Sequence, residues 1–258
     1  MKTSKTFVRL FTTALALIGA VLTTPLPAAA ASGAIAGKAV VVKVDGAASY
    51  VGAKGADGAV RVGMTLHQGT SIITGTESSV ILDLGENGET VVVRPNTTLS
   101  LDTLQLLPTG IEKIATTRID LKRGSMAFSV KKLAAASKYE VKTANGVAGI
   151  RGSEGIIYAT GVFVCLDGTL LVSVTNLTTG VVELFTVTRG NTGTASGSNI
   201  VLTPIPPADF NRMKADIGTA TLAVQEVRPP AGRPPPSASE VAAQVVKPFI
   251  SPVTPALP

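Results

Sequence analysis

Residues 119–131 read IDLKRGSMAFSVK, and this stretch decides the fold class. Apolar and polar residues alternate from Ile119 to Lys122 and again from Met126 to Lys131, with a glycine between the two runs. A period of two places every second side chain on the same face of an extended strand. The stretch therefore predicts strands with one buried face.

The same signal extends outward from Gly37 to about Thr203, where short runs of Val, Ile, Leu and Thr are separated by Gly, Asn and Asp. A helical period is almost absent, and aromatic residues make up only 4% of the chain, so an aliphatic sheet core is expected. Region 37–203 is predicted to be one all-β domain of many short strands. A β-sandwich and a short β-solenoid are the two architectures that fit.

Two local patterns refine this interpretation. Some runs are apolar throughout and predict strands covered on both faces: Val40 to Val42, Val91 to Val93 and Leu170 to Val174. Four pairs favour tight hairpins because Asn, Asp and Gly tolerate positive φ: Asp45-Gly46, Asn87-Gly88, Asn145-Gly146 and Asp167-Gly168.

The two ends of the chain differ from this region in composition. Residues 1–31 have a basic leader, an apolar run and small residues near Ala31, which is the layout of a signal peptide cleaved there. Threonine and proline interrupt the run, so no stable membrane span is expected after cleavage. Residues 204–227 are predicted to be a linker with a short helix from about Phe210 to Val224, capped by Asp209. Residues 228–258 contain nine prolines and are predicted to be a Pro-rich disordered tail.

Charge and cysteine content exclude some classes of function. The formal net charge of +6 falls to +3 without residues 1–31, and the remaining Lys and Arg are scattered, so a nucleic-acid partner is not expected. Cys165 is the single cysteine and lies in an apolar run, which predicts a buried thiol and no internal disulfide.

Candidate catalytic residues are few. His67 is the only histidine, and no nucleophile elbow, phosphate loop or zinc-ligand spacing is present. Asp83, Glu86 and Glu89 flank a glycine turn, where solvated charges are expected; a weak calcium loop or a hydrolase using His67 is less favoured. The chain is therefore predicted not to be an enzyme and to need no metal or cofactor.

The segment GVAGIRGSEG, residues 146–155, is the predicted binding segment, with Arg151, Ser153 and Glu154 as its candidate residues. Arg151 stands among glycines, which let other groups approach closely, and its planar fork of donors suits a carboxylate. The favoured alternative is that Arg151 pairs with Glu154 or with nearby carbonyl groups and locks a bend between strands.

Between Gly37 and about Gly190, several short motifs follow one another in a fixed order and spacing: Val62 to Leu66 leading to Gly69, Ile72 to Gly75, Glu77 to Leu84, Ile119 to Leu121 with Gly124, Tyr139 to Thr143, and Ala148 to Glu154. With this order and spacing, the stretch resembles the FecR-domain family. Ser153 stands where the family more often has threonine, and Ala144 where it often has proline.

This resemblance implies an all-β module that holds or senses protein partners and performs no chemistry. Family members that regulate sigma factors carry a cytoplasmic helical domain and a membrane span ahead of this module. The present sequence is more similar to the stand-alone exported members.

Two functions are therefore expected from the sequence. The first is a non-enzymatic periplasmic or secreted module that binds an envelope protein or a surface glycan. The alternative is a self-associating structural or surface-array protein of the bacterial envelope, because aliphatic strands with exposed edges are templates for pairing.

Overall fold

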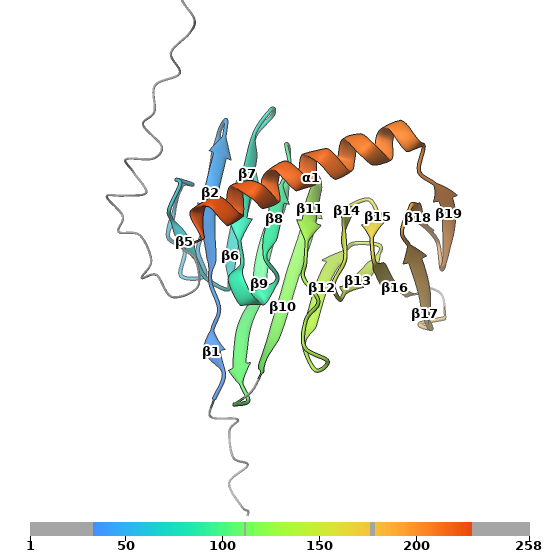
Figure 1. Cartoon of the computed structure of the whole chain (residues 1–258), viewed down its shortest axis with the longest axis horizontal. Helices are drawn as coiled ribbons and strands as arrows, with labels where there is room; N and C mark the ends of the chain where they lie inside the picture. The colour runs from blue at the N-terminus through green and yellow to red at the C-terminus, as the bar shows by residue number, and fades with distance from the viewer. Residues whose placement is uncertain (1–32, 111, 176–178, 229–258) are drawn as a thin grey trace, which may run out of the picture. The chain divides into compact units, whose positions relative to one another are not determined.

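The computed structural model describes residues 33–110, 112–175 and 179–228 (Figure 1). These residues form mostly β-strands, followed by an α-helix. The predicted signal peptide at residues 1–31 and the predicted tail beyond Arg228 lie outside the described residues. No helix in the described part of the chain is long and apolar enough to cross a membrane.

The strands of the described residues form two sheets. Sheet A has ten strands: β1 (Ile35–Ala36), β3 (Ala48–Val51), β4 (Asp57–Ala59), β6 (Thr70–Thr74), β9 (Thr98–Pro108), β10 (Lys113–Arg123), β12 (Lys138–Thr143), β13 (Gly146–Ile150), β16 (Thr169–Thr175) and β17 (Val182–Thr188). Sheet B has nine strands: β2 (Ala39–Asp45), β5 (Thr65–Leu66), β7 (Ser79–Asp83), β8 (Thr90–Val93), β11 (Ser125–Ser129), β14 (Glu154–Tyr158), β15 (Val162–Asp167), β18 (Asn191–Ser196) and β19 (Asn199–Pro204).

The chain extends both sheets in the same direction, adding strands first to one sheet and then to the other. Sheet A has the order β4-β3-β6-β9-β10-β12-β13-β16-β17, with β1 beside β9, and sheet B has the order β5-β2-β7-β8-β11-β14-β15-β18-β19. Strands β10 and β12 are parallel, and the other neighbours in the described residues are antiparallel. The all-β prediction is confirmed, and the two stacked sheets form a β-sandwich.

The alternating runs of the sequence supply the core between the sheets. Fully buried side chains come from these runs: Leu99, Leu101, Ile119, Leu121, Met126 and Phe128. Burying one such side chain contributes about 1.5–3 kcal/mol, so the aliphatic strands together provide a large driving force without any Trp.

The second face of sheet B is covered by α1 (Pro207–Val227), whereas no described element covers the second face of sheet A (Figure 1). In β8, Val91 and Val93 face the core, and Val92 packs against the clusters under the helix. The run Leu170 to Val174 was also predicted to be covered on both faces, but it lies in sheet A, and Leu171 is 49% exposed. That part of the prediction is wrong because an apolar run does not show which sheet the helix covers.

Helix α1 is longer than the helix predicted at Phe210 to Val224 and begins at Pro207, a position where the missing N–H of proline costs nothing. Asp209 is not the cap; it forms an ion pair with Arg212 at 2.8 Å. The helix buries Ile217, Ala220 and Val224. Residues 204–227, predicted to be a linker with a short helix, therefore contain a helix that packs on sheet B.

Glycine turns have two different roles. Asn145-Gly146 lies at a tight hairpin between β12 and β13, as predicted. Asn87-Gly88 also lies between antiparallel neighbours, β7 and β8, but in a longer connection that contains a 3-10 turn at Gly85–Asn87. Asp45-Gly46 and Asp167-Gly168 were also predicted to form hairpins, but each carries the chain from sheet B to sheet A. A residue with positive φ redirects the chain sharply, and this geometry serves a crossing between sheets as well as a hairpin.

Candidate binding groove

The predicted binding segment lies where the chain leaves sheet A. Strand β13 ends at Ile150, and the chain crosses through Arg151, Gly152 and Ser153 to strand β14 of sheet B. Ala148 and Ile150 are buried in the core. Alternation along the strand therefore directs Gly149 to the uncovered face of sheet A. Arg151, the first residue after the strand, is exposed and lines the same groove as Gly149.

Gly152 makes this crossing possible. Its φ is +75°, a left-handed conformation that side chains other than glycine rarely adopt. A Cβ atom at this position would lie 3.0 Å from Lys132 Cα, so the neighbouring chain also requires glycine here.

Ser153 is buried and joins two crossings. Its hydroxyl donates a hydrogen bond to the carbonyl oxygen of Thr169 at 2.7 Å and accepts one from the Thr169 N–H at 3.2 Å. Thr169 follows Gly168, where the chain returns from sheet B to sheet A. Ser153 therefore positions the two crossings relative to each other and is not open to a ligand.

Glu154 contacts the helix on sheet B. Lys214 Nζ lies 2.7 Å from Glu154 Oε2 and 3.6 Å from Asp167 Oδ2. The expected pair between Arg151 and Glu154 is not formed, because Glu154 faces α1 while Arg151 faces the opposite layer. Arg151 is exposed and forms no hydrogen bond or ion pair with any described residue.

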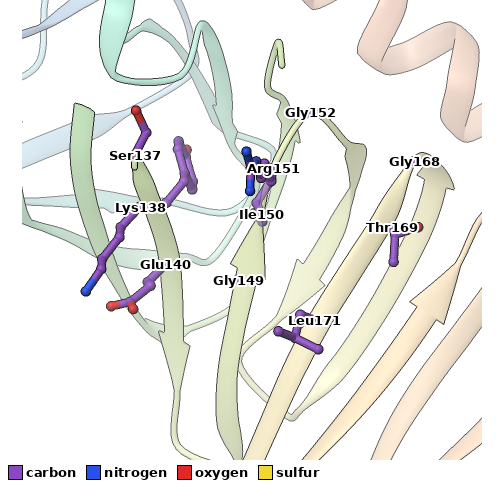
Figure 2. A pocket seen from close by; sticks show the side chains of 11 residues that line it. Ser137, Lys138, Glu140, Gly149, Ile150, Arg151, Gly152, Gly168, Thr169 and Leu171 are labelled. Atoms are coloured by element: carbon purple, nitrogen blue, oxygen red, sulfur yellow. The ribbon is translucent and has the colours of Figure 1, made fainter. Parts of the chain in front are cut away.

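Beside Arg151 lies an open groove of about 540 Å³ (Figure 2). In the registers of β12, β13 and β16, Glu140 and Leu171 stand on either side of Gly149. Since Gly149 has no side chain, a notch lies between the charged side chain of Glu140 and the apolar side chain of Leu171. Figure 2 shows Lys138 and Glu140 on one side of Arg151, and Thr169 and Leu171 on the other.

The groove carries uncompensated positive charge. Glu140 is paired with Arg118 at 2.9 Å, while Arg151 and Lys138 have no ion-pair partner among the described residues. Tyr139 lies beneath, and burial raises the pKa of its phenol, which therefore stays neutral. The local chemistry suits a ligand that presents a carboxylate next to an apolar group.

Lys138, Thr169 and Leu171 were not among the predicted site residues. They come from β12 and β16, the two strands that flank β13 in sheet A. The signal that leads to them is strand register: once Gly149 is aligned with its neighbours, the residues that flank the notch follow.

Comparison with known proteins supports one family. Residues 70–183 match the family model described as FecR protein. This segment is a FecR domain. The match is shorter than the resemblance from Gly37 to Gly190: it begins at β6, ends in β17, and includes the whole predicted binding segment.

Solved structures give a weaker likeness. Two crystal structures of a proposed anti-sigma factor from Parabacteroides distasonis ATCC 8503 align with TM-scores of 0.40 and 0.39, at 11% and 12% identity. Each alignment covers 52% of this chain and 59% of that chain, so the match spans less than two thirds of the other protein. No curated protein matches this sequence.

A second hollow of about 690 Å³ lies at the turn between β7 and β8 of the FecR domain. The carboxylates considered above for calcium or hydrolysis are held here by cations: Asp83 and Glu89 by Arg228, Glu89 also by Lys131, and Glu86 by Lys113. The hydrogen bond from Arg228 to Asp83 raises the pKa of the guanidinium. Within the described ranges, no group of three or more His, Cys, Asp or Glu residues could hold a metal ion.

His67 is exposed at the turn between β5 and β6 and lines neither hollow. A site combining His67 with Asp83, Glu86 or Glu89 is therefore not formed in either of them.

Proposed function

We propose that this chain is a non-enzymatic module, exported to the periplasm or cell surface of a bacterium, that binds an envelope protein or surface glycan. The observation that carries the proposal is Arg151, an exposed arginine without a partner in the described chain, beside the notch at Gly149. The match to the FecR family and the predicted signal peptide at residues 1–31 support the envelope context.

The geometry favours recognition over catalysis. A binding surface needs exposed donors on a rigid element, and Arg151 follows directly from a strand whose neighbours fix its position. Catalysis needs a base or nucleophile with a free functional group, whereas the carboxylates at the β7–β8 turn are all engaged by cations.

The groove also indicates the ligand group. A guanidinium binds carboxylates through parallel hydrogen bonds, and the Lys138 ammonium adds a second positive charge. Leu171 offers apolar contact across the notch. An acidic side chain of a partner protein or an acidic sugar of a glycan would satisfy both.

The test is capture of partners from envelope extract by the full chain, purified after export. The wild-type protein should retain a stoichiometric partner, and Arg151→Gln should reduce capture about tenfold, the loss expected for a charged hydrogen bond. Gly149→Val should also reduce capture, because its side chain would fill the notch. The sheet should tolerate this change, since a Cβ at Gly149 would lie 3.5 Å or more from the nearest atoms, which belong to Leu171.

Arg61→Gln is the matched control, because Arg61 is exposed and lies outside the groove. Capture that is equal for all four proteins, or no capture by any of them, would contradict the proposal. Fractionation of cells tests the location separately, and retention of the chain in the cytoplasm would overturn that part.

A further inference from the structure

Exposed apolar side chains are concentrated at one end of the sandwich. Ten large hydrophobic residues are exposed in the described part of the chain, and six of them lie in or beside the last strands: Leu171, Val181, Val182, Leu184, Val201 and Leu202. Apolar surface gathered in this way indicates an interaction surface, unlike single apolar residues scattered over a protein.

The last strand of sheet A is an unprotected edge. Strand β17 has seven residues and one charged side chain, Glu183, and one of its two sides has no neighbouring strand among the described residues. At the opposite end, the edge strands β4 and β5 have only three and two residues. Proteins commonly protect edges with short or charged strands, whereas β17 is seven residues long and carries a single charge.

The core is also open at this end. Phe185 is only partly buried against the main core. Leu202 lies on the core side of β19, because it and the buried Val187 both lie close to Gly193: a Cβ at Gly193 would be 3.6 Å from Leu202 Cδ2 and 2.6 Å from Val187 Cγ2. Leu202 is nevertheless 52% exposed. A sandwich that grows strand by strand needs a cap where it stops, as the terminal repeats of solenoids do.

We propose that two copies of this chain join through β17, paired antiparallel about a two-fold axis at Phe185. Centring on Phe185 pairs all of the seven residues Val182–Thr188, and Phe185 then meets its own copy at the open core. Leu184 faces Thr186 and Glu183 faces Val187 across the axis, so no like charges oppose each other.

A second copy fits this edge better than the chain's own C-terminal segment. Helix α1 carries the chain away from β19, and its last residue is followed by Arg228, which is bound to Asp83 and Glu89 (Figure 1). Residues 228–258 contain nine prolines, which lack the N–H groups that strand pairing needs.

The two-fold arrangement differs from a surface array. Each copy uses its β17 edge once, so pairing through β17 is closed. The edge strand of sheet B at this end, β19, has six residues and ends at Pro204, which has no N–H for strand pairing. The groove at Gly149 lies on the face of sheet A and stays accessible, because pairing occurs in the plane of the sheet.

Analytical ultracentrifugation of the purified mature chain over a wide concentration range tests the proposal. A dimer is expected, and Leu184→Lys should weaken it at least about tenfold, because Leu184 lies next to the two-fold axis and its replacement would bring two lysine charges together there. Leu222→Lys on α1 is the matched control, since Leu222 is 61% exposed and Leu184 is 65% exposed. Circular dichroism should be unchanged in both variants.

A strict monomer would overturn the proposal, as would growth into larger polymers or equal dimerisation of Leu184→Lys. The register has its own test in the double variant Leu184→Cys and Thr186→Cys. Mild oxidation should link two chains in this variant, because these two positions face each other across the axis. A dimer without such a link would refute the register centred on Phe185.

Discussion

The hydroxyl of Ser153 binds both backbone groups of Thr169, donating to its carbonyl oxygen at 2.7 Å and accepting from its N–H at 3.2 Å. These two residues belong to neighbouring crossings between the sheets, one leaving sheet A and one returning to it. The corner that presents Arg151 is therefore held by a side chain that does not itself face the groove.

Removal of this hydroxyl should destabilise the fold. Ser153→Ala removes these partners from the Thr169 backbone groups in a partly buried place, so the free energy of unfolding should fall by about 1–3 kcal/mol. Ser153→Thr keeps the hydroxyl and should lose less. Urea denaturation measures both, with the exposed Ser49→Ala as a control expected to change by less than about 0.5 kcal/mol. Equal stability of Ser153→Ala and Ser49→Ala would show that the bridge contributes nothing.

Gly152→Ala should lower the free energy of unfolding by more than its positive φ alone would cause. Gly152→Ala must adopt positive φ and also displace the backbone of Lys132, 3.0 Å from the new Cβ. Gly190→Ala has a similar φ of +81° but no atom within 4 Å of its Cβ. Thermal and urea unfolding should therefore show a loss of about 1–2 kcal/mol for Gly190→Ala and a clearly greater loss for Gly152→Ala. If the losses were equal, the close approach to Lys132 would have no energetic effect.

The fold class could be predicted from the sequence because period two is a property of each strand by itself. Ile119, Leu121, Met126 and Phe128 are buried as their alternation requires. The assignment of strands to sheets is different, because it depends on contacts between distant segments. Asp167-Gly168 has hairpin chemistry but carries the chain between sheets, and this cannot be determined from the turn residues alone.

The candidate site shows the same division. Sequence reasoning found Arg151 through its glycine neighbours, but it did not find Lys138 or Leu171, which reach the groove by strand register. It also grouped Ser153 and Glu154 with Arg151 because they are neighbours in sequence. Successive residues at a crossing face different layers, so Ser153 is buried and Glu154 faces Lys214 of α1.

The attachment of α1 should depend on Arg228. This guanidinium lies 3.2 Å from Glu89 Oε1 and also binds Asp83, and both carboxylates are largely buried. Arg228→Gln leaves Asp83 without its cation, so the free energy of unfolding should fall by roughly 1–2 kcal/mol. Hydrogen exchange should also increase in the last turns of the helix.

Arg212→Gln is the control for Arg228, because the Arg212 pair with Asp209 is solvent-exposed within one helix. Such pairs contribute about 0.5 kcal/mol or less. Indistinguishable stability and hydrogen exchange in the two variants would mean that Arg228 does not fasten the helix.

Cys165 should be protected from thiol reagents in the folded protein. The side chain is fully buried in β15, as predicted, with Sγ 3.4 Å from the carbonyl oxygens of Asp167 and Gly168. Burial, with a smaller contribution from the Asp167 carboxylate, raises the pKa of the thiol to about 11. With this pKa, only about 0.1% of the Cys165 thiol would be ionised at pH 8. Because the thiolate is the reactive form, labelling should follow unfolding.

The raised pKa also sets a direction for stability against pH. The folded state favours the neutral thiol, so this contribution is fully present below the unfolded pKa near 9 and is lost as pH rises toward 11. Over that window the free energy of unfolding should fall more steeply in the wild-type protein than in Cys165→Ala. The difference between the two slopes should be at most about 1.4 kcal/mol per pH unit. Urea titrations of both proteins from pH 7 to about pH 11 measure the difference. Parallel curves, or rapid labelling of the native protein at pH 8, would show that solvent reaches the Cys165 thiol in the folded protein and that burial does not raise its pKa.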